Sequence, residues 1–202
     1  MRIITIGREF GSGGRELGKR LAEALHISYY DKEIIEIIAK EHGFDEKYVS
    51  HISESSINAA YPRTIGHRFA VSYQGMDQSV KATATQQKII RNFAGQGDCV
   101  IVGRCADVIL GDLHPMNIFV YANQESKVAR CVSRSAEGEK LPRSRMEQMM
   151  RQVDKDRAKY REMLTDTHWG EKEAYHLCVN TSGKDIKTLI PVLAEYATRW
   201  FE

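Results

Sequence analysis

The chain has 202 residues, of which 42% are hydrophobic and 28% are charged, and its formal net charge is +2. This length suits a single domain spanning residues 1–202, with a sizeable core. The nearly balanced charge does not indicate a broad surface for nucleic acid. No apolar run is long enough to span a membrane, and the N-terminus does not resemble a signal peptide. We therefore expect a cytoplasmic protein that binds neither nucleic acid nor a membrane.

The N-terminal segment reads as a strand, a glycine-rich loop and a helix. Residues 3–6 form an apolar β-branched run, and apolar residues recur with helical spacing from Leu17 to Leu25. The glycines between them let backbone N–H groups turn inward, and the helix adds the positive end of its dipole, so the loop suits a phosphate. We expect a phosphate group to contact this loop, which comprises Gly11, Ser12, Gly13, Gly14, Arg15 and Glu16.

This loop departs from the usual phosphate-binding loop, G-x-x-x-x-G-K-[ST], at two positions. In that motif the lysine meets the outer phosphates and the hydroxyl binds magnesium. Here Gly14 stands at the lysine position and Glu16 at the hydroxyl position. Arg15 is the nearest cation in the sequence and is predicted to replace the lysine in part. The alternative interpretation is an ordinary glycine-rich turn between a strand and a helix.

The next segments predict a second strand and then an irregular region. Residues 26–30 resemble a short strand, and Asp31 at its end either caps the following helix or contacts a ligand. From about 42 to 75 the hydrophobic pattern has no clear period, which is typical of a partly helical excursion or a binding flap. Arg63 lies in this segment and is a candidate ligand contact.

Three further apolar runs predict strands at 99–102, 117–121 and 176–180. Together with the two N-terminal strands they alternate with helical patterns, which is typical of a parallel sheet covered on both faces. We therefore predict an α/β fold with a five-stranded parallel sheet between helices. Ligands of such sheets bind beyond the carboxyl ends of the strands, where Arg104 and Asp107 stand.

The segment between the last two predicted strands is the most basic part of the chain. Its arginines include Arg130, Arg134, Arg151 and Arg157, and acidic residues are interleaved with them. This pattern is typical of solvated helices with ion pairs. It also fits a lid that closes over phosphates and offsets the charge that develops during phosphoryl transfer. We favour the lid because the glycine-rich loop lies in the same chain.

Several short motifs occur together along the chain. They are GREFGSGGR at 7–15, YYDK at 29–32, GRCAD at 103–107, DKDRAKY at 154–160, WG at 169–170 and NTS at 180–182. On these motifs the sequence resembles the cytidylate kinase-like family, a branch of the P-loop nucleoside monophosphate kinases. The resemblance covers essentially the whole chain. It implies a helical flap for the nucleoside monophosphate at about 42–75 and an arginine-rich lid at about 134–165.

The resemblance also implies a reaction and the residues that serve it. The γ-phosphoryl of ATP, with Mg²⁺, would pass to a nucleoside monophosphate, with CMP or dCMP as the expected acceptor. On the donor side, Arg130 and Arg134 would join the glycine-rich loop. The charge that develops during transfer would meet Arg15, Arg151 and Arg157. The acceptor would meet Asp31, Arg63, Arg104 and Asp107.

Two departures from the family pattern keep other functions open. Cytidylate kinases carry an acid after the arginine that corresponds to Arg104, where this chain has Cys105, and Asp107 is expected to compensate. The lysine of the phosphate loop is replaced by Gly14. One alternative is a nucleotide-binding regulatory protein that has lost kinase turnover. Another is a kinase for a different small molecule.

Overall fold

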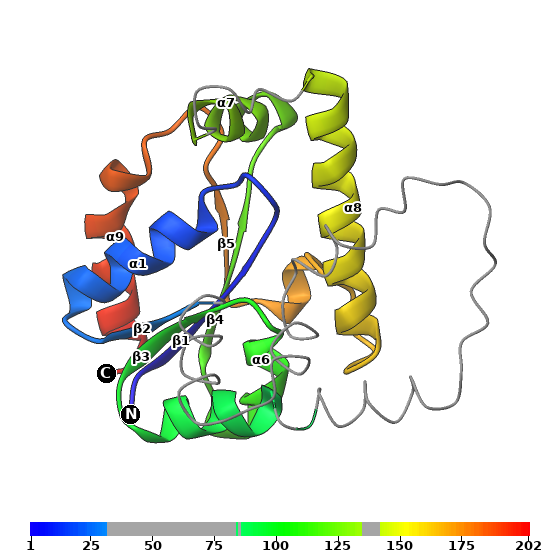
Figure 1. The fold of residues 1–202 in the computed structure, drawn as a ribbon. Helices are drawn as coiled ribbons and strands as arrows, with labels where there is room; N and C mark the ends of the chain where they lie inside the picture. The colour runs from blue at the N-terminus through cyan, green and yellow to red at the C-terminus, as the bar shows by residue number, and fades with distance from the viewer. Residues whose placement is uncertain (32–83, 85, 135–141) are drawn as a thin grey trace, which may run out of the picture.

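The computed structural model describes residues 1–31, 84, 86–134 and 142–202. A five-stranded parallel sheet lies at its centre, in the strand order β2-β3-β1-β4-β5 (Figure 1). The strands are β1 (Ile3–Arg8), β2 (Ser28–Tyr30), β3 (Cys99–Val102), β4 (Met116–Tyr121) and β5 (Leu177–Asn180). The predicted sheet is confirmed. The predicted flap at 42–75, with Arg63, lies outside the described residues.

Helices cover both faces of the sheet. They are α1 (Gly14–Leu25), a helix at 86–95, α6 (Ala106–Ile109), α7 (Gln124–Arg134), α8 (Arg143–Glu162) and α9 (Ile186–Trp200), with short 3₁₀ turns η1 (Gly111–Leu113) and η2 (Lys172–Ala174). α1 and α9 lie against each other, and α8 stands on the opposite side of the molecule (Figure 1). Among the described helices, none is both long enough and apolar enough to cross a membrane.

Alternate side chains of β1 enter two separate hydrophobic clusters. Ile4 and Ile6 pack with Leu21 of α1 and with residues of α9. Ile3 points the other way and packs with the helix at 86–95 and with α6. Successive side chains of a strand point to opposite faces, so a strand that is covered on both faces is apolar throughout. This burial explains the continuous apolar run that predicts β1.

The sheet extends to both sides of β1, with β3 and β2 on one side and β4 and β5 on the other. β1 pairs with β3 on one side, with Ile6 opposite Val102, and with β4 on the other, with Arg8 opposite Val120. The chain leaves β1 at its carboxyl end and enters the glycine-rich loop. In open parallel sheets such a switch point is where ligands bind. The loop and the ends of β3 and β4 therefore share one edge of the sheet.

The packing of α1 on the sheet can be tested at Leu21, which is fully buried. We expect Leu21→Ala to lower the free energy of unfolding by about 2–5 kcal/mol, because it leaves a cavity between α1 and the sheet. Val192→Ala, on the exposed side of α9, is expected to change it by less than about 0.5 kcal/mol. Urea denaturation followed by circular dichroism measures both. Equal effects would contradict the packing.

Candidate phosphate-binding site

The loop between β1 and α1 has the backbone shape of an anion site. Gly11 and Gly13 have φ angles of 75° and 85°, in the left-handed region that glycine adopts without strain. Gly13 is also the N-cap of α1, and no side chain caps this helix. Amides in the first turn of a helix have no intrahelical acceptor, and the helix dipole adds positive charge there. The start of α1 can therefore receive a phosphate.

Hydrogen bonds from outside the loop hold the peptide that follows Ser12. The carbonyl oxygen of Ser12 accepts from Oγ1 of Thr181 at 2.6 Å and from Nη1 of Arg130 at 3.3 Å. The carbonyl and the amide of a trans peptide point in opposite directions, so the amide of Gly13 faces away from Thr181. Ser12 is fully buried, and its hydroxyl donates to the carbonyl of Glu9 at 2.8 Å. Ser12 thus fixes the shape of the loop.

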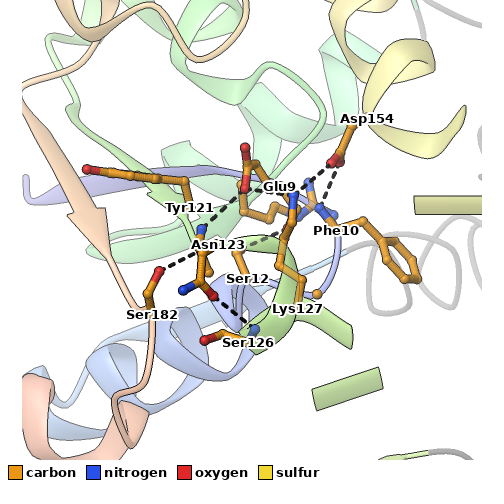
Figure 2. Close-up of polar contacts among 12 residues, drawn as sticks. Glu9, Phe10, Ser12, Tyr121, Asn123, Ser126, Lys127, Asp154 and Ser182 are labelled. Atoms are coloured by element: carbon orange, nitrogen blue, oxygen red, sulfur yellow. Dashed lines mark hydrogen bonds and ion pairs between the residues drawn. The ribbon is translucent and has the colours of Figure 1, made fainter. Parts of the chain in front are cut away.

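A carboxylate lies beside the loop, and a buried lysine offsets its charge. The backbone amide of Glu9 extends the pairing with β4 by donating to Val120 at 3.0 Å. The Glu9 carboxylate accepts from the amide of Ala122 at 3.2 Å and from the ammonium group of Lys127 at 3.1 Å (Figure 2). Lys127 belongs to α7 and is 9% exposed. The pair reduces the repulsion that Glu9 would exert on a phosphate.

Helix α8 holds the other side of the loop through an acid and an arginine. The carboxylate of Asp154 accepts from the amide of Phe10 at 2.7 Å (Figure 2). Arg157 donates to the carbonyl of Arg8 at 3.0 Å and lies 3.3 Å from Asp154. Burial raises the pKa of Asp154. The structure thus brings Arg157, a predicted lid residue, to the loop, whereas Arg151 is exposed on α8.

Helix α7 brings the other two predicted lid arginines to the start of α1. Arg134 pairs with one carboxylate oxygen of Glu16 at 2.6 Å, and Arg20 pairs with the other at 2.8 Å. Arg130, one turn earlier on α7, donates to carbonyl oxygens of the glycine-rich loop and to the hydroxyl of Thr181 at 3.2 Å. Glu16, at the position of the usual magnesium-binding hydroxyl, therefore joins α1 to α7.

Arg15 turns toward the end of β2. Its Nε atom lies 2.7 Å from a carboxylate oxygen of Asp31, and the hydroxyl of Tyr29 donates to the same oxygen at 3.0 Å. Asp31 is only 4% exposed. Burial and the nearby charge of Asp31 raise the pKa of Tyr29, which keeps its hydroxyl protonated. The structure thus brings two predicted site residues, Arg15 and Asp31, together at the end of β2.

The chain ends β3 in a strained turn. Gly103, Arg104 and Cys105 have successive φ angles of 83°, 61° and 50°. Non-glycine residues in this region cost about 1–3 kcal/mol each and cluster at functional sites. Burial, and then the charge of Asp107, raise the pKa of Cys105 to about 12, so this thiol is neutral at physiological pH. The position that carries an acid in cytidylate kinases therefore has no charge here.

Asp107 forms a buried ion pair with Arg161 of α8. The two residues are 9% and 3% exposed. Arg161 also donates to the hydroxyl of Thr167 at 2.9 Å. Asp107 thus links α6 to α8, and its carboxylate is engaged by a partner that the sequence did not identify.

A cavity of about 360 Å³ opens beside the loop. Its lining includes the aromatic side chains of Phe119, Tyr121 and Trp169, together with Glu9. Of these residues only Glu9 belongs to the loop, so the cavity adjoins the candidate phosphate site. Within the described part of the chain, no group of three His, Cys, Asp or Glu side chains could hold a metal ion.

The fold and the site together define a class of protein, the small-molecule kinases with a glycine-rich phosphate loop. The loop lies at the carboxyl end of β1, and arginines of α7 and α8 lie against it. The chain belongs to the cytidylate kinase-like family, whose model matches residues 3–183. A comparison with curated protein sequences finds no match.

Solved structures share this fold over nearly the whole chain. An uncharacterised protein from Eubacterium ventriosum is 27% identical, with a TM-score of 0.70, over 98% of this chain and 99% of that one. Shikimate kinase from Bacteroides thetaiotaomicron is 13% identical, with a TM-score of 0.57, over 96% and 97%. A gluconokinase from Sinorhizobium meliloti is 14% identical, with a TM-score of 0.54, over 98% and 93%. The likeness to these two kinases concerns the fold.

Glu9 and Thr181 are among the residues that shape the site but have no role predicted from the sequence. Both lie in quoted motifs, at 7–15 and 180–182. A carboxylate within a phosphate loop is itself a signal, because it requires a nearby cation. Lys127 supplies that cation from α7.

The buried pair of Asp107 and Arg161 can be tested by removing its carboxylate. We expect Asp107→Ala to lower the free energy of unfolding by about 3–5 kcal/mol, because it leaves a buried charge without its counter-ion. Asp112→Ala, which breaks the exposed pair with Arg91, is expected to cost less than about 1 kcal/mol. Urea denaturation compares the two variants. A loss for Asp107→Ala as small as that for Asp112→Ala would show that the pair does not stabilise the fold.

Proposed function

We propose that this chain transfers the γ-phosphoryl group of ATP to a nucleoside monophosphate, with CMP or dCMP as the acceptor. The observation that carries the proposal is the uncapped start of α1, which follows a glycine-rich loop whose peptides are held from outside. Membership of the cytidylate kinase-like family supports the nucleotide as substrate. Phosphoryl transfer depends mainly on positioning and charge, so this arrangement supplies what the reaction needs most.

The donor phosphates would bind to the backbone amides between Gly11 and Glu16, including those of Ser12, Gly13, Gly14 and Arg15. Arg130 and Arg134 keep the loop and α7 in contact, and both add positive charge beside the phosphates. Magnesium would enter with ATP and offset phosphate charge. Glu16 has one oxygen on Arg20 and one on Arg134, so it fits a structural role better than that of a magnesium ligand.

The acceptor would bind at the ends of β2 and β3. Arg104 is fixed there by the strained turn, and Asp31 lies at the neighbouring strand end, where Arg15 reaches it. Asp107 would act through Arg161, which it orients. Arg63 is proposed to reach the acceptor from the flap. During transfer, positive charge would come from Arg15, Arg151 and Arg157.

A panel of acceptors tests this function directly. The purified chain is mixed with ATP, Mg²⁺ and one acceptor at a time, and ADP formation is measured. The panel holds CMP, dCMP, UMP, AMP and GMP, with shikimate and gluconate as acceptors that are not nucleotides. We expect CMP or dCMP to raise ADP formation most. ATP binding by calorimetry without transfer to any acceptor would favour a regulatory protein, and transfer to a non-nucleotide alone would favour another small-molecule kinase.

Arg157 offers a test of the charge that α8 brings to the loop. We expect Arg157→Ala to lower kcat with the best acceptor by about 10²–10³-fold, as the loss of one charge-stabilising group does at such sites. Arg143→Ala removes an exposed arginine from the start of the same helix and is expected to leave kcat unchanged. Circular dichroism checks that both variants fold. An Arg157→Ala enzyme with full kcat would remove Arg157 from the catalytic set.

A further inference from the structure

The space beside Gly14, where a phosphate loop usually carries its lysine, is filled by another side chain. A Cβ atom placed on Gly14 would lie 2.5 Å from Cβ and 3.0 Å from Cγ of Arg8. It would also lie 3.3 Å from Cβ of Val120. Non-bonded carbon atoms favour separations of about 3.5–4.0 Å, so a side chain at position 14 and the stem of Arg8 exclude each other.

The other end of the Arg8 side chain is accommodated by a second glycine. A Cβ atom on Gly103 would overlap the Arg8 guanidinium group. Gly103 lies directly after β3, and its amide donates to the carbonyl of Ile6 at 2.9 Å, which fixes it beside β1. Burial raises the pKa of Cys105, and the charge of Arg8 opposes that rise, as expected for a guanidinium close to this turn. Arg8 therefore runs from the loop to the end of β3.

We propose that Arg8 supplies the positive charge that the lysine supplies in an ordinary phosphate loop. This inference rests on the proposed kinase function. The stem of Arg8 passes Gly14, and its guanidinium lies against the turn at Gly103. That is the boundary between the proposed donor and acceptor sites, where the outer phosphates of ATP would meet the acceptor. A guanidinium remains charged at any physiological pH and can bind two phosphate oxygens at once.

Three of the other cations near the loop are held by groups of the protein. Arg15 contacts Asp31 at the end of β2. Lys127 lies 3.1 Å from Glu9 and 4.0 Å from Asp154. Arg157 donates to the backbone carbonyl of Arg8. Arg8 has the further advantage that it ends the central strand, because a residue paired in the sheet is held more rigidly than one on a lid.

Nucleotide binding tests this assignment without requiring turnover. Calorimetry with AMP, ADP and ATP, each with Mg²⁺, gives the gain in affinity from AMP to ATP. We expect this gain in the wild type, and we expect Arg8→Met to reduce it by about 10–100-fold, the value of a charge-assisted contact. The affinity for AMP should stay within about twofold, because its phosphate lies at the helix start. Arg199→Ala, which removes an exposed arginine of α9, should leave all three affinities unchanged.

An exchange of the two positions makes the test more specific. Gly14→Lys alone would collide with Arg8, and it should lose the gain from AMP to ATP. Arg8→Gly combined with Gly14→Lys removes the colliding atoms and restores a lysine at its usual position. This double variant should recover most of the gain. Arg8→Gly alone should not show the gain from AMP to ATP. Recovery in the double variant would then be due to the new lysine and not merely to the removal of the Arg8 side chain.

The outcomes separate this inference from the proposed function. A wild type that binds ATP no more tightly than AMP would overturn both. If the wild type shows a clear gain in affinity from AMP to ATP and Arg8→Met retains it in full, the role of Arg8 is overturned. The kinase proposal would still stand. Failure of the double variant to regain affinity, with a normal circular dichroism spectrum, would show that position 14 does not lie near the outer phosphates and would also overturn the assignment.

Discussion

The shape of the glycine-rich loop depends on hydrogen bonds that it receives from distant parts of the chain. Thr181 and Arg130 hold the carbonyl of Ser12, and Asp154 holds the amide of Phe10. Glycine has more conformational freedom to lose than any other residue, so a loop of this composition would otherwise sample many shapes. The loop loses this conformational entropy when the protein folds. Less entropy is therefore lost when an anion binds.

Charge around the loop is arranged in pairs that leave the helix start positive. In the described part of the chain, Glu9 has Lys127, Glu16 has two arginines, Asp31 has Arg15 and Asp107 has Arg161. Each pair offsets a carboxylate that would otherwise repel phosphate. The amides and dipole of α1 are thereby left to attract an anion. The proposed anion site is therefore compatible with one glutamate in the loop, Glu9, and another in the first turn of α1, Glu16.

The sheet and the loop could be predicted from the sequence, but the directions of the charged side chains could not. Strands and helices follow from local hydrophobic patterns, and the glycines mark the turn. The partner of Arg15 lies 16 residues away, directly after β2, and that of Asp107 lies 54 residues away on α8. Neither pairing has a local signal. Arg8 also has no local signal, because the loop motif marks positions near 14, whereas the cation proposed to replace the lysine lies at the end of β1.

The steric exclusion between Arg8 and a side chain at position 14 has a consequence for the evolution of such loops. With the role proposed for Arg8, a lysine in the loop and an arginine at the strand end are alternatives, because a Cβ atom at position 14 would lie only 2.5 Å from Cβ of Arg8. A path between them that changes one residue at a time passes through a sequence with both cations, which collide, or with neither. Such a path is unfavourable at every intermediate. Lineages with the two arrangements would therefore remain separate once established, even with the same fold around them.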